Sequence, residues 1–198
     1  MKKSLLTLLL AAALAAPVFA SEKGDMDLDL KLGYTVSDSI KIEYTAGSDS
    51  GSTDKNFILG ADFYYYLHSN VALGVGINNL FYSKADYGYD DKYGFTNIYF
   101  SVKPKMDLKS DIFTGVYGIA QIGYGILRLD YDTDGMGPQP DKKNGLYWAV
   151  GAGAEIMKNF IFELIYSCNN AGIEFTNDPS ADIKYSAFSV NVGYKFSL

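Results

Sequence analysis

Apolar side chains occur at every second position along most of this chain. From Met26 to Val36 they alternate without a break with Asp, Lys, Gly and Thr. Because successive side chains of a β-strand point to opposite faces, this period of two predicts strands with one apolar and one polar face. No stretch with the period of a helix interrupts the series.

The alternation predicts eight strands. They cover about residues 26–36, 57–67, 71–78, 96–105, 112–129, 146–157, 160–169 and 184–198. In the fifth of these strands, Ile119 and Leu127 share a face with Gln121 and two glycines. Gln121 and the glycines favour that face as the inner one.

The connections between these strands alternate in length. The long ones are rich in Gly, Ser, Asp and Asn and cover 37–55, 83–95, 130–145 and 170–183. The short ones cover 68–70, 106–111 and 158–159. This rhythm predicts an up-and-down sheet with loops at one end and tight turns at the other. Closing the first strand onto the last removes both exposed edges, which favours an eight-stranded antiparallel barrel.

The two faces of the predicted sheet differ in content. The apolar face carries almost no charge, whereas the polar face carries glycines, tyrosines and the ionisable residues Asp27, Asp29, Lys31, Asp62, Lys103, Glu155, Glu163 and Lys195. An apolar exterior is insoluble in water but suited to lipid, and a closed barrel pairs every backbone group within the membrane. We therefore predict an all-β transmembrane barrel whose charged residues neutralise one another in the lumen. A soluble barrel with an apolar interior is the alternative.

Aromatic side chains on the apolar face fall near its two ends, as expected where a barrel meets the lipid headgroups. Near the short turns they are Tyr65, Phe160, Phe162, Tyr194 and Phe196. Near the long loops they are Tyr34, Phe81, Trp148, Tyr166 and Phe188.

The first twenty residues have the pattern of a secretory signal peptide. Lys2 and Lys3 precede an apolar core from Leu5, and small residues precede a cleavage site after Ala20. We expect residues 21–198 to form one barrel domain. Loss of two lysines changes the formal charge from −6 to about −8, which argues against nucleic acid as a partner.

One acidic segment has the spacing of a calcium-binding loop. Positions 1, 3, 5 and 12 of that pattern are filled by Asp130, Asp132, Asp134 and Asp141. The last ligand is Asp rather than the usual Glu, and two prolines interrupt the segment. A solvated acidic loop is therefore the main interpretation. Calcium is the alternative, and we expect no other cofactor.

The last strand ends in the sequence NVGYKFSL. Its Asn191, Gly193, Phe196 and Leu198 resemble the C-terminal signal that the bacterial barrel-assembly machinery reads. Over residues 21–198 the chain resembles the OmpA/OmpX-type eight-stranded outer membrane β-barrel family. The resemblance implies a Gram-negative outer membrane, termini in the periplasm and long loops at the cell surface. It also implies outer membrane lipid and the assembly machinery as partners.

The residues and the resemblance together predict a non-enzymatic barrel with a structural or surface-interaction role, acting on an unknown partner through four long loops. No nucleophile and base occupy neighbouring strand positions. A narrow channel or small-molecule conduit is the first alternative, although porin channels need about sixteen strands. A lipid-modifying barrel enzyme is the second.

Overall fold

The structure, a computed structural model, describes residues 23–44, 47–84, 92–130, 141–174 and 180–198. The predicted signal peptide, residues 1–20, lies outside the described residues. No helix among the described residues is long and apolar enough to cross a membrane. The strands are β1 (Met26–Tyr44), β2 (Gly47–Gly51), β3 (Phe57–His68), β4 (Val71–Lys84), β5 (Lys92–Asp107), β6 (Phe113–Asp130), β7 (Asp141–Lys143), β8 (Gly145–Ile156), β9 (Phe160–Glu174) and β10 (Ala181–Ser197).

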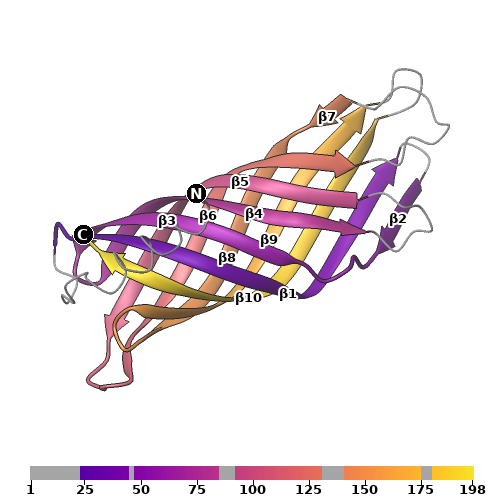
Figure 1. Cartoon of the computed structure of the whole chain (residues 1–198). Helices are drawn as coiled ribbons and strands as arrows, with labels where there is room; N and C mark the ends of the chain where they lie inside the picture. The colour runs from indigo at the N-terminus through magenta and orange to yellow at the C-terminus, as the bar shows by residue number, and fades with distance from the viewer. Residues whose placement is uncertain (1–22, 45–46, 85–91, 131–140, 175–179) are drawn as a thin grey trace, which may run out of the picture.

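Eight of these strands close into an antiparallel barrel (Figure 1). Each pairs with the next along the chain in the order β1, β3, β4, β5, β6, β8, β9 and β10. β10 then pairs with β1, from Asp27 opposite Ser197 to Glu43 opposite Asp182. The predicted eight-stranded up-and-down barrel is confirmed, and the pairing of β10 with β1 removes the edges that the first and last strands would otherwise expose.

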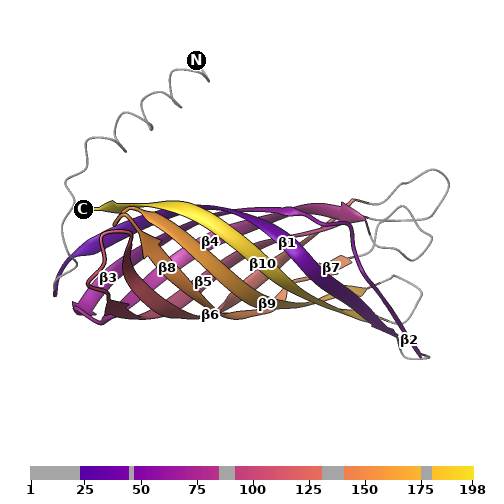
Figure 2. The ribbon, with the colours of Figure 1, turned by 90° about the horizontal axis from the view of Figure 1, so that it is seen from below.

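The short turns lie at one end of the cylinder, whereas β2 and β7 lie at the other end (Figure 2). We call these the turn end and the loop end. The long connections predicted at 37–55, 130–145 and 170–183 are shorter in the structure. β1, β9 and β10 continue well into them, and β2 and β7 add short strands that pair with β1 and β9.

A β-bulge explains why the first strand looks shorter in the sequence. The register of β1 against β10 shifts between Thr35 and Ser37, so the inward face changes from odd-numbered to even-numbered residues. The Thr35 hydroxyl accepts a hydrogen bond from the Asn56 backbone N–H (2.7 Å), and the Thr35 N–H donates to the Asn56 carbonyl (2.8 Å). Beyond the bulge, Ile40 and Ile42 point inward and are buried.

The outer face of the barrel wall is apolar, as predicted for a surface in lipid. Large apolar side chains are exposed around it at Leu32, Leu59, Val75, Ile98, Phe100, Ile122, Val150 and Val192. None of the ten aromatic residues predicted near its two ends is buried. Several of their rings pair on the surface, including Trp148 with Tyr166 and Phe160 with Tyr194.

The polarity of the wall is inverted beyond the aromatic residues of the loop end. We call this part the extension; it comprises residues 37–44, 92–95, 127–130, 171–174 and 181–187 together with β2 and β7. Its inner face packs with Leu80 of β4 into an apolar core; the other members are Ile40, Ile42, Tyr93, Phe95, Leu127, Leu129, Ala171, Ile173, Ala181, Ile183, Tyr185 and Ala187. Its outer face carries Lys41, Glu43, Asp130, Glu174, Asp182 and Lys184. Apolar inside and charged outside is the polarity of a barrel in water.

The charged outer face of the extension is ion-paired. The ammonium groups of Lys41 and Lys184 lie 2.8 and 2.9 Å from the Glu43 carboxylate. Their hydrogen bonds lower the pKa of Glu43 to about 2. Glu43 therefore stays ionised at any ordinary pH, and this surface remains charged.

Candidate functional site

The inner face of the barrel below the extension is densely charged. The seven residues of the predicted lumen network all lie there and are buried: Asp29, Lys31, Asp62, Lys103, Glu155, Glu163 and Lys195. Asp27 is buried on the same face. The structure adds Lys105, the last residue of the predicted strand 96–105, which the predicted network did not include. Its position two residues after Lys103 puts it on the same face, and this spacing was the available signal.

The group nearest the extension is centred on Lys31. Its ammonium forms ion pairs with Asp62 on β3 and with Glu163 on β9, the latter at 3.1 Å. The hydroxyl of Tyr99 donates to Asp62 (2.7 Å) and that of Tyr117 donates to Glu163 (3.1 Å). Side chains from five strands are therefore linked through the Lys31 ammonium and its two carboxylates. Partners of this kind are what a buried charge requires.

The next group is the ion pair of Lys103 with Asp29, at 2.9 Å between ammonium and carboxylate. Both side chains are fully buried. The ammonium also lies 4.6 Å from the ring centroid of Tyr64 and 4.3 Å from that of Tyr117, within the range of a cation–π interaction. Aromatic rings thus fill the space on two sides of this pair.

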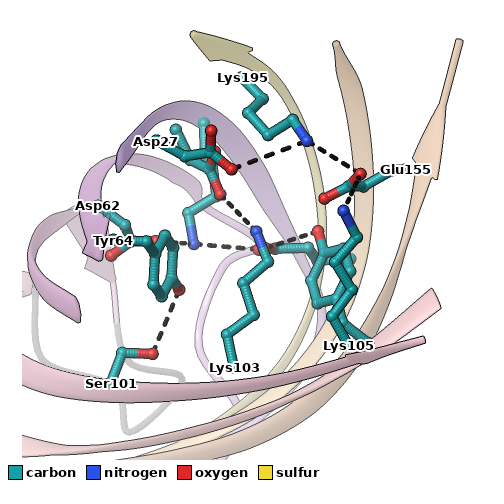
Figure 3. A network of polar contacts seen from close by, with 12 residues as sticks. Asp27, Asp62, Tyr64, Ser101, Lys103, Lys105, Glu155 and Lys195 are labelled. Atoms are coloured by element: carbon teal, nitrogen blue, oxygen red, sulfur yellow. Dashed lines mark hydrogen bonds and ion pairs between the residues drawn. The ribbon is translucent and has the colours of Figure 1, made fainter. Parts of the chain in front are cut away.

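The group closest to the turn end contains two lysines and two carboxylates (Figure 3). Lys195 lies between Asp27 (3.7 Å) and Glu155 (2.9 Å). Lys105 reaches Glu155 at 3.0 Å from the opposite side, and the Tyr66 hydroxyl donates to Asp27 at 3.0 Å. These contacts link β1, β3, β5, β8 and β10 across the lumen.

The three groups together make a plug of paired charges. Every ammonium in it contacts at least one carboxylate, and tyrosine hydroxyls supply further hydrogen bonds. No cluster of side chains able to hold a metal ion occurs among the residues that the structure describes. Asp130 and Asp141 are exposed, whereas Asp132 and Asp134 lie outside the described residues. Calcium binding by this loop stays a prediction.

Glycines on the inner face make room for the plug, and two of them allow a matched test. A Cβ at Gly76 would lie 2.0 Å from an Asp62 carboxylate oxygen and 2.5 Å from the Tyr99 ring. Gly76→Ala should therefore lower the free energy of unfolding by about 1–3 kcal/mol, the usual effect of overpacking. A Cβ at Gly60 would lie 3.5 Å from its nearest neighbouring atom, which is ordinary contact. Gly60→Ala should therefore change the free energy of unfolding by less than about 0.5 kcal/mol.

Urea titration of both glycine variants in lipid vesicles measures this difference. Equal stability of Gly76→Ala and the unaltered protein would show that the lumen around Asp62 is less tightly packed than described.

The residues that resemble an assembly signal lie along the end of β10. Asn191 is buried on the inner face, and Leu198 is exposed at the turn end, where its N–H donates to the Met26 carbonyl (2.8 Å). A Cβ at residue 193 would lie 2.5 Å from the Leu30 carbonyl oxygen. Close packing of β1 and β10 at the barrel seam is thus a structural reason for glycine at this position.

Comparison with known proteins agrees with this architecture. The model of the outer membrane protein β-barrel domain matches residues 6–196. The chain belongs to this family. As a member of it, the protein lies in the outer membrane, and the apolar outer face described above is its lipid-facing surface. Among curated proteins, no sequence matches it significantly.

Solved structures of outer membrane barrels share the fold. OprG from Pseudomonas aeruginosa is 13% identical with a TM-score of 0.56, covering 91% of this chain and 99% of OprG. The attachment invasion locus protein Ail of Yersinia pestis is 12% identical with a TM-score of 0.52, covering 88% of this chain and 99% of Ail. Neisserial surface protein A is 15% identical with a TM-score of 0.51, covering 85% and 96% of the two chains. At such identities the likeness concerns the fold alone.

Proposed function

We propose that this protein is a non-enzymatic outer membrane barrel with a structural or surface-interaction role rather than a channel. The observation that carries the proposal is that two successive layers of side chains fill the lumen. The paired charges fill it toward the turn end, and the apolar core of the extension fills it toward the loop end. An ion would have to pass both a dry apolar layer and a layer of neutralised charges.

The inverted polarity of the extension supports the surface role. An apolar core under a charged outer face makes the wall stable in water, so the strands carry the four loop regions beyond the lipid on a rigid support. In this proposal the loop end faces the cell exterior, and an unidentified surface partner binds the loops. The turn end and the C-terminal residues face the periplasm, where the assembly machinery engages β10.

Conductance and lipid analysis test the role together. Protein refolded into planar bilayers should give no single-channel steps under conditions in which a porin conducts. Lipid A from cells that produce the protein should keep its mass. Steady conductance would favour the small-molecule conduit instead, and a changed lipid A mass would favour a lipid-modifying enzyme.

The surface role has its own test. Cells that display the protein should bind a panel of extracellular-matrix proteins or host cells more than cells that display a variant in which residues 85–91 and 131–140 are replaced by short Gly-Ser turns. The variant should still migrate as a folded barrel in unboiled gels, which separates loss of binding from loss of folding. Equal binding by both would contradict a role for these two loop regions.

A further inference from the structure

A small cavity lies in the lumen between the paired charges and the apolar core of the extension. Its volume is about 30 Å³. Its lining includes Lys31, Asn78, Asn97, Gln121, Tyr147 and Asn169. Asn191 of β10 also lines it, so amide side chains from five strands meet here, and we call this cavity the amide chamber.

Three of these amides and Tyr147 form a directed chain of hydrogen bonds. The amide nitrogen of Asn97 donates to the Asn78 oxygen at 2.8 Å. The Asn78 nitrogen donates to the Tyr147 hydroxyl at 3.2 Å, which in turn donates to the Gln121 oxygen at 2.8 Å. Because the chain uses the nitrogen of Asn97 and the oxygen of Gln121, it leaves the Asn97 oxygen and the Gln121 nitrogen free to bind another group.

Three polar atoms of the chamber have no hydrogen-bond partner among the described residues. They are Oδ1 of Asn97, Oδ1 of Asn169 and Nε2 of Gln121. Their side chains are 3%, 2% and 5% exposed, so bulk water does not reach them. The two oxygens converge on the position that a Cβ of residue 125 would take. This position lies 3.0 Å from Oδ1 of Asn97 and 2.6 Å from Oδ1 of Asn169. Two acceptors aimed at one point require a shared donor.

We propose that the amide chamber is a binding site for two water molecules, which are a fixed part of the folded barrel. One water donates both of its hydrogens to the Asn97 and Asn169 oxygens, and the other accepts from Gln121. One water molecule needs about 10–15 Å³ of cavity volume. The chamber, at about 30 Å³, therefore has room for two. A cation would leave the amide nitrogen of Gln121 without an acceptor, and the two unpaired acceptors disfavour an anion or an apolar molecule.

The site is independent of the proposed surface role. The three unpaired atoms are buried, so waters bound to them should exchange slowly. Magnetisation transfer from water to the Gly125 Hα protons, measured by NMR on the protein in nanodiscs, reports such waters directly. The unaltered protein should show this transfer.

Two substitutions at one position sharpen the test. Asn169→Leu removes one of the converging acceptors and fills its space, so the transfer to Gly125 should be lost. Asn169→Ser keeps a polar group and space, so the transfer should persist. Absence of the transfer in the unaltered protein, its survival in Asn169→Leu, or electron density in the chamber too large for two waters would each overturn the proposal. The measurement on the unaltered protein decides the matter even where a variant does not fold.

Discussion

Lys31→Met should lower the free energy of unfolding by about 3–5 kcal/mol, because it leaves the buried carboxylates of Asp62 and Glu163 without their cation. The Tyr99 and Tyr117 hydroxyls would still donate to them, but a neutral donor does not balance a charge. The loss should appear as a lower urea midpoint in lipid vesicles. It should also appear as a lower temperature at which the folded band disappears from gels.

The matched control for this prediction is Lys41→Met. Lys41 also pairs with a carboxylate, that of Glu43, but its side chain is 47% exposed on the outside of the extension. Surface pairs contribute about 0.2–1 kcal/mol, so the control should be close to the unaltered protein. A triple variant that also carries Asp62→Asn and Glu163→Gln should recover part of the loss. Equal effects of Lys31→Met and Lys41→Met would contradict the description of the lumen as a buried ion-paired plug.

The second large effect is expected from two adjacent residues of β10. Ile183 is fully buried in the apolar core of the extension, whereas the Lys184 side chain is 51% exposed on its outer face. Ile183→Lys puts an unpaired ammonium into the apolar core and should lower the free energy of unfolding by about 3–5 kcal/mol. Lys184→Ile removes only a surface pair with Glu43 and should lower it by less than about 1 kcal/mol.

Limited proteolysis and urea unfolding together measure this pair of variants. With Ile183→Lys, cleavage should become faster in the extension while the band of the folded barrel persists in unboiled gels. Further along the same strand, residue 192 is on the outer face and meets lipid. Val192→Lys should therefore lower the free energy of unfolding by about 2–4 kcal/mol, although the adjacent outer face of the extension tolerates lysine. If Lys184→Ile were the more damaging of the two adjacent changes, the inverted polarity of the extension would be wrong.

Much of the fold could be read from alternation alone. The prediction of which face points outward is confirmed. Leu59 and Val192 are exposed on the outer face, and Asp62 and Lys195 are buried on the inner face. It required only the geometry of a strand and the insolubility of an apolar exterior in water. The end of the first strand was misjudged because the bulge after Thr35 interrupts the period, and Ile40 and Ile42 then resume it on the other face.

The candidate site was predictable as a set of residues but not as a set of contacts. A period of two places Lys31 and Glu163 on the inner face, yet these residues are 132 positions apart in the chain. Which lysine meets which carboxylate depends on the register of all the strands between them. The amide chamber escaped prediction for the same reason, since Asn78, Asn97 and Asn169 are unremarkable polar residues until closure brings them together.

The sequence by itself determined the number of barrel strands, their up-and-down order and which face meets lipid. These follow from a local property, the alternation of side chains, combined with the polarity of the two media. Only the tertiary structure decided where the wall inverts its polarity, how each buried charge is paired and where a polar chamber remains. These depend on the tilt and stagger with which the barrel closes, which join residues that no local pattern relates.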